Sequence, residues 1–147
     1  MLEVRLAAPE EWDEALPLAA SPQGDGWRLA TRFPAGLRGG HPAERAHLVV
    51  VRWQQRIAAC GLRVVLPVAH AGRPALLGYL TGLRCAADLP RHLGLRCLRA
   101  SFQALAQTRR DDELPVDLTS ILSGNQRARR LLEAGLDGLP TYHFRAW

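Results

Sequence analysis

The stretch formed by residues 91–96 combines residue types that bind anions. Arg91 carries a positive charge, His92 can gain one, and Gly94 lets a ligand approach the backbone closely. A helical pattern follows, and the first N–H groups of a helix have no partner within it, so they can bind phosphate oxygens directly. We therefore predict a turn that binds phosphate or pyrophosphate here, with an ordinary loop before a helix as the alternative.

Asn125 is the only asparagine of the chain and stands directly before a second helical pattern. An asparagine in this place commonly caps a helix by accepting a hydrogen bond from its first turn. The same side chain could instead contact a bound ligand, and both roles can coexist. The helix it opens has Ala128, Leu131, Leu132 and Leu136 on one side and Arg127, Arg129 and Arg130 on the other.

The three cysteines, Cys60, Cys85 and Cys97, form no pattern typical of a metal site. Their number is odd, they contain no CxxC pair, and no histidine stands nearby at metal-ligand spacing. We expect reduced thiols, with Cys85 and Cys97 as small buried hydrophobic residues. Without a signal pattern or a long apolar run, the sequence predicts a cytoplasmic protein that does not enter a membrane.

The elements that must position these residues follow from the periodicity of the chain. Alternating or short apolar runs predict strands at residues 2–6, 47–53, 56–69, 74–85, 116–121 and 142–147, with turns at 54–55 and 71–73. Helical spacing predicts helices from Pro9 to Ala20, from Leu95 to Ala106, and from Asn125 to Gly135 or Gly138. Residues 21–44, rich in Gly and Pro, are expected to form a long surface segment with one helical turn near 27–31.

Residues 42–60 could also be drawn as one helix. The β-branched run at 49–51 and the polar pair at 54–55 favour two strands instead. Within the second of these strands, Gly61 predicts a bulge and Pro67 predicts an edge or an irregular end.

Length and charge limit the possible classes of protein. A chain of 147 residues with 48% hydrophobic content predicts one domain over residues 1–147. The formal charge of +5 would suit a nucleic acid or a nucleotide cofactor, but all 19 basic residues are arginine and they are scattered along the chain. Nucleic-acid binding is therefore the weakest hypothesis.

The order of these elements resembles the GNAT superfamily of acyl-CoA N-acyltransferases, most clearly over residues 74–147. The family's phosphate-binding turn has the form Arg/Gln-x-x-Gly-x-Gly/Ala, and its place is taken here by Arg91-His92-Leu93-Gly94-Leu95-Arg96. The second match is the Asn-x-x-Ala-x-x-x-Leu helix that begins at Asn125. Arg96 departs from the family pattern, because its bulk could obstruct a phosphate while its charge could pair with one.

The resemblance implies an α+β fold: a mixed, mostly antiparallel sheet of about six strands with helices on both faces. Its fourth and fifth strands would splay apart around the pantetheine arm of acetyl-CoA or another acyl-CoA. The backbone of Leu83, Arg84 and Cys85 would then pair with the pantetheine amides, as an added strand does. Asn125 would contact the same arm.

Catalytic residues are harder to assign. Many family members protonate the departing thiolate with a tyrosine, but Leu132 occupies that position here, and Tyr142 is only a weak candidate for the role. Tyr79 and Thr81 share one side of a strand and could line an acceptor pocket or pack in the core. No general base can be identified.

Two functions remain as hypotheses. The first is N-acylation, most simply N-acetylation, of a small-molecule or peptide amine by direct attack on the thioester. The alternative is a binding or dimerisation domain that keeps the GNAT fold without the chemistry, an alternative suggested by Arg96 and Leu132. A homodimer is possible in either case.

Overall fold

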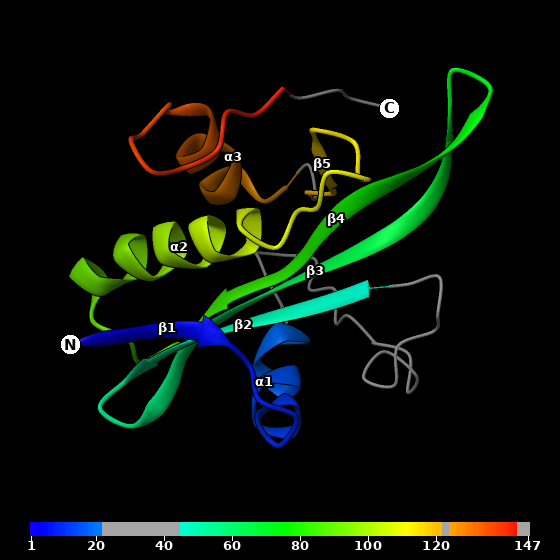
Figure 1. Cartoon of the computed structure of the whole chain (residues 1–147). Helices are drawn as coiled ribbons and strands as arrows, with labels where there is room; N and C mark the ends of the chain where they lie inside the picture. The colour runs from blue at the N-terminus through cyan, green and yellow to red at the C-terminus, as the bar shows by residue number, and fades with distance from the viewer. Residues whose placement is uncertain (22–44, 122–123, 144–147) are drawn as a thin grey trace.

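The computed structural model describes residues 1–21, 45–121 and 124–143, and within them one sheet lies between helices (Figure 1). Its elements are β1 (Leu2–Leu6), α1 (Glu11–Ala19), β2 (Arg45–Trp53), β3 (Arg56–His70), β4 (Arg73–Cys85), α2 (Arg91–Ala106), β5 (Asp117–Thr119) and α3 (Gln126–Glu133). The five strands lie in the order β1-β2-β3-β4-β5, antiparallel except for the parallel pair β4 and β5. The expected mixed, mostly antiparallel sheet is confirmed.

Strand β2 is buried on both faces. Leu48 and Val50 pack in the cluster that includes Ala15 of α1, whereas Val49 packs with Phe102 of α2 on the other face. Burial on both sides explains why the sequence shows a continuous apolar run here instead of an alternation. The interpretation of residues 42–60 as strands is therefore correct for the part of that range that the structure describes.

Two tight turns join the central strands. Gln54 and Gln55 both have positive φ, at 51° and 63°, and Ala71 and Gly72 do so at 50° and 76°. Two successive residues with positive φ match the right-handed twist of a two-residue hairpin. Both predicted turns are confirmed.

The bulge predicted at Gly61 of β3 lies instead on β4, opposite Gly61. The β3–β4 register shifts between Cys60 and Leu62, and the extra residue is on β4, where Gly82 has φ of 62°. A Cβ on Gly61 would lie 2.7 Å from Leu83 Cδ2. Gly61 therefore makes room for the side chain that the bulge turns toward it.

Several expected boundaries differ from the structure. Helix α2 begins at Arg91, so the expected turn at residues 91–96 is already helical and the loop is residues 86–90. The fifth strand is shorter than 116–121, and Tyr142 and His143 are not in a strand. The rest of the expected sixth strand, residues 144–147, lies outside the described residues, as does the expected helical turn at 27–31.

The helices form two layers around the sheet. Helix α1 covers one face, and α2 and α3 lie on the other (Figure 1). In the described part of the chain, no helix is both long enough and apolar enough to cross a membrane.

Candidate functional site

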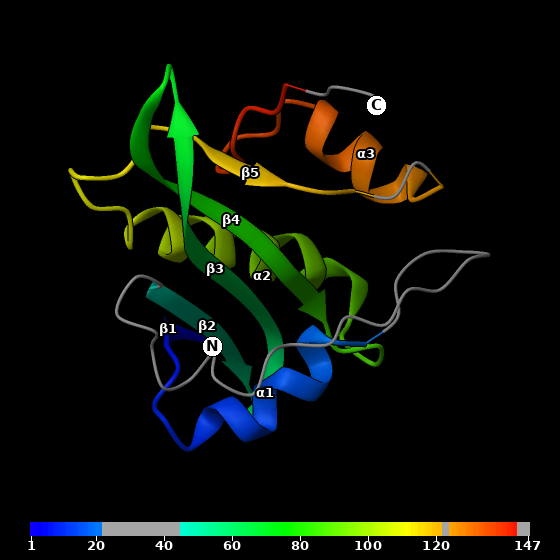
Figure 2. The same ribbon diagram turned by 90° about the vertical axis from the view of Figure 1, so that its right-hand side faces the viewer.

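Strands β4 and β5 run together for a short distance and then diverge. They pair only from Gly78 with Asp117 to Leu80 with Thr119, where the Thr119 hydroxyl donates to Leu80 O at 2.8 Å. Strand β4 continues to Cys85, while the chain after β5 leaves toward α3 (Figure 2). Residues 81–85 of β4 thus have no described strand on their β5 side, and we call this part of the sheet the splay.

The predicted contact residues Leu83, Arg84 and Cys85 lie in the splay. Leu83 and Cys85 pack toward the α2 face. Arg84 lies on the α1 side, where its guanidinium donates to Ser21 O and to Leu83 O, both at 3.0 Å. Burial lowers the pKa of Arg84. One backbone acceptor of the splay is therefore already used by a neighbouring side chain.

The first turn of α2 contains an open position at Gly94. Arg91 and His92 are exposed, Leu93 is buried, and the helix starts at Pro90 without a side-chain cap. A Cβ on Gly94 would meet no atom within 4 Å. Packing therefore does not require glycine at this position, although glycine costs a helix roughly 1 kcal/mol relative to alanine. The missing side chain leaves the start of the helix accessible to a ligand.

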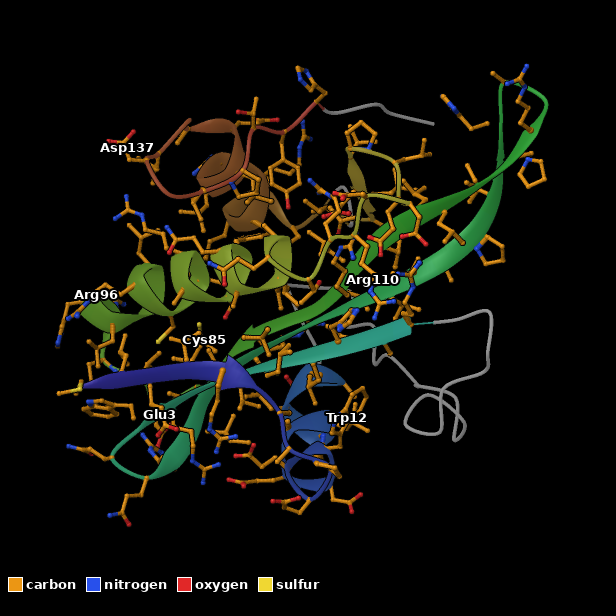
Figure 3. All side chains as sticks on the ribbon, viewed as in Figure 1. Glu3, Trp12, Cys85, Arg96, Arg110 and Asp137 are labelled. Carbon is orange, nitrogen blue, oxygen red and sulfur yellow. The ribbon has the colours of Figure 1, made fainter. Side chains whose placement is uncertain are left out.

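Arg96 does not occupy this open position. Its side chain is exposed at the outer end of α2 (Figure 3), and none of its atoms lies within 4 Å of the Cβ site on Gly94. The obstruction that the sequence suggested is thus not present in this conformation.

Asn125 is the N-cap of α3. Its Oδ1 accepts a hydrogen bond from Ala128 N at 3.2 Å, which confirms the capping role expected from sequence. A contact between Asn125 and a ligand remains a prediction.

The thiols of the site region are poor nucleophiles. Burial raises the pKa of Cys60 to about 12 and that of Cys85 to about 11, and burial also raises the pKa of Cys97. These groups are protonated at neutral pH, and only a thiolate attacks efficiently. The expectation that Cys97 is a buried hydrophobic residue is confirmed, and Cys85 is half-buried.

Tyr142 and Leu132 belong to the core between α2 and α3. The ring of Tyr142 meets Phe102 edge-on, with centroids 6.3 Å apart, and Leu132 is buried in the same cluster. Burial raises the pKa of Tyr142 to about 12. Packing explains the position of both side chains, and a catalytic role for Tyr142 stays a prediction.

Tyr79 and Thr81 are half-buried on the opposite face of β4. Tyr79 pairs with Val64 and Thr81 with Leu62, and both partners pack in the α1 cluster. The two side chains thus share one face, as expected from their spacing.

A buried ion-pair cluster, which the sequence did not reveal, holds the start of β5 beside β4. Arg63 of β3 is fully buried, and its Nη2 lies 2.6 Å from Glu113 Oε2 and 2.9 Å from Asp117 Oδ1. Arg109 also binds Asp117, at 2.7 Å. Burial alone would lower the pKa of Arg63, but its hydrogen bonds to Asp117 and Glu113 raise it.

The side chain of Arg63 crosses over β4 at Gly78. A Cβ on Gly78 would lie 2.6 Å from Arg63 Cζ and would also collide with Asp117. Only glycine leaves a path for Arg63 of β3 to reach Asp117 of β5 over the strand between them. The signal in the sequence is an arginine within a strand that is otherwise apolar. A charged side chain in such a strand is rarely buried unless it pairs with an opposite charge.

Comparison with solved structures identifies the fold. An acetyltransferase from Trypanosoma brucei superposes with a TM-score of 0.61 at 15% identity, covering 100% of this chain and 97% of that one. Glucosamine-6-phosphate N-acetyltransferase from Arabidopsis thaliana gives 0.59 at 10% identity, covering 100% and 98%. Ribosomal-protein-alanine N-acetyltransferase from Brucella melitensis gives 0.56 at 16% identity, covering 100% and 99%.

Sequence comparison adds no closer relative, since no protein-family model and no curated protein sequence matches the chain. At such low identities the structural likeness shows the fold alone. The chain has the GNAT-like fold of these acetyltransferases.

Proposed function

We propose that this protein is an N-acyltransferase that uses acetyl-CoA or another acyl-CoA. The observation that carries the proposal is the splay between β4 and β5, which lies beside the open first turn of α2, with Cys85 Sγ 3.9 Å from Gly94 O. A strand edge and a helix start together can hold an extended amide-containing chain that ends in a phosphate group.

The described residues fit this cofactor in three places. The backbone of residues 83–85 would pair with pantetheine amides, and the α2 residues Arg91, His92, Leu93, Gly94, Leu95 and Arg96 would bind the pyrophosphate. Asn125 would contact the arm between them. Bound acyl-CoA would supply an acyl group activated as a thioester. An acceptor amine of a small molecule or peptide would attack it, forming an amide and releasing the CoA thiol.

Binding of the cofactor can be measured directly. We expect acetyl-CoA or a longer acyl-CoA to raise the melting temperature and to give a saturable heat in calorimetry, because a ligand that binds only the folded state stabilises it. If none of these thioesters produces either signal, the cofactor proposal is wrong. If a thioester does bind, release of free CoA thiol in the presence of a panel of amines distinguishes an enzyme from a binding domain.

Replacing Gly94 with alanine should have opposite effects on stability and on binding. The free enzyme should gain roughly 0.5–1 kcal/mol in free energy of unfolding, since alanine is the better helix former and its Cβ meets no atom. Affinity for acyl-CoA should fall about tenfold, because the methyl group occupies the space that the phosphate needs. Denaturant unfolding and calorimetry measure the two effects, and unchanged affinity would remove Gly94 from the site.

Substitutions of Asn125 can separate its two roles. Asn125→Ser keeps an oxygen that can cap α3, so stability should change by less than about 0.5 kcal/mol, whereas Asn125→Ala should cost about 1 kcal/mol. If the amide also contacts the cofactor, both variants lose affinity for acyl-CoA by a similar factor. If only the alanine variant binds more weakly, Asn125 acts through the helix alone.

A non-catalytic GNAT-fold domain is the second candidate. Leu132 favours it, because it stands where the resemblance places the proton-donating tyrosine and its side chain has no proton to donate, while Tyr142 packs partly buried against the same core cluster. Any thioester turnover above the uncatalysed rate would eliminate this alternative.

A further inference from the structure

Strand β1 forms one edge of the sheet. It pairs with β2 through five successive residues, from Leu2 with Trp53 to Leu6 with Val49, and the register contains no shift. Among the described residues no other strand pairs with it. It lacks proline and bulges, two devices by which proteins protect an edge from pairing with another chain.

The backbone N–H and C=O groups of three β1 residues point toward that edge. Ala7 N donates to Leu48 O at 2.8 Å, so Ala7 faces β2. In an antiparallel ladder the groups that face a neighbour alternate, and Leu2, Val4 and Leu6 consequently direct their N–H and C=O groups outward. These are the groups that a further strand would bind.

The side chains of the same strand are partly uncovered. Val4 is 36% exposed and Leu6 51%, although both alternate with charged residues as in a strand with one buried face. Val4 and Leu6 border a hollow of about 340 Å³ that is also lined by Ala104 of α2 and by Gln107, the residue that follows this helix. The opposite face carries Glu3 and Arg5, as expected from the alternation.

We propose that the protein forms a two-fold symmetric dimer in which β1 pairs antiparallel with β1 of a second copy. The sequence Leu2-Glu3-Val4-Arg5-Leu6 is complementary to itself about Val4. Antiparallel pairing places Val4 opposite Val4, Leu2 opposite Leu6, and Glu3 opposite Arg5 of the second copy. Every contact then joins two apolar side chains or two opposite charges, which is the favourable arrangement for cross-strand pairs.

The side chain of Arg5 is already held by two carboxylates of its own chain. Arg5 binds Glu11 of α1, with Nη2 2.8 Å from Oε1, and its Nε binds Glu3 at 2.8 Å. Because Arg5 is fixed in the monomer, a second copy would lose little side-chain freedom on binding it. The proposal concerns the opposite edge of the sheet from the splay and does not depend on acyl-CoA.

The oligomeric state of the full chain tests the proposal. Sedimentation velocity across micromolar concentrations should show a reversible dimer, and Glu3→Arg should raise its dissociation constant about tenfold by placing like charges opposite each other. Val4→Lys, which places two lysines at the symmetry axis, should leave only monomer. Circular dichroism checks that both variants fold.

A matched control and a residue-level measurement complete the test. Leu118 is 54% exposed on β5 at the other edge of the sheet, so Leu118→Lys should leave the dissociation constant unchanged. Amide exchange of Val4 and Leu6 should slow as concentration rises, whereas the amides of Glu3 and Arg5 should be protected throughout. A monomer at every concentration, a dimer that survives Val4→Lys, or a dimer that Leu118→Lys breaks would each overturn the proposal.

Discussion

Gly78→Ala is expected to lower the free energy of unfolding by about 3–5 kcal/mol, the usual cost of breaking a buried ion pair. The new Cβ would occupy the path by which Arg63 reaches Asp117, 2.6 Å from Arg63 Cζ. The guanidinium must then move away from at least one carboxylate and remain buried without it. Urea unfolding followed by circular dichroism measures the loss.

Gly124→Ala provides the control for Gly78→Ala. A Cβ on Gly124 would meet no atom within 4 Å, so this variant should stay within about 0.5 kcal/mol of the parent. Combining Gly78→Ala with Arg63→Ala should cost less than the sum of the two, because the second change removes the group with which the new methyl collides. Strict additivity would contradict the proposed collision.

Arg63→Met is the second large effect and should also cost about 3–5 kcal/mol, for a different reason. No new atom is forced into the core, but Glu113 and Asp117 lose their shared cation. Each carboxylate keeps one other partner, Arg45 at 3.4 Å from Glu113 and Arg109 at 2.7 Å from Asp117. The same unfolding measurement applies.

Two further variants identify the cause of this loss. Adding Glu113→Leu to Arg63→Met should recover part of the stability, since apolar replacement of both members of a buried pair is often nearly neutral. Arg73→Met removes an exposed arginine at the start of β4 and should change stability by less than about 0.5 kcal/mol. An Arg63→Met protein as stable as the parent would mean that the cluster does not hold β5.

The meander of β2, β3 and β4 could be predicted because its signals are local. The apolar run at residues 49–51 and the turns after Trp53 and His70 are properties of adjacent residues. The N-cap of α3 could be predicted for a similar reason, since Asn125 stands directly before its helix. The types of neighbouring residues were enough to assign each of these elements.

The Arg63 cluster could not be predicted, because it joins residues that are far apart in the chain. Arg63, Gly78 and Asp117 come from three strands, and only the sheet order brings them together. The start of α2 was misplaced for another reason. Gly94 usually signals a turn, but Leu93 and Cys97 are both buried one helical turn apart, which fits a helix that begins at Arg91.

The spatial order of the strands is the same as their order along the chain. During synthesis, each new strand can therefore add to an open edge, and none has to be inserted between two strands that are already paired. The hairpins from β2 to β4 close loops of a few residues, which costs little chain entropy. Strand β5 has to wait for α2, so the last of the described strands to dock is also the one that completes the splay.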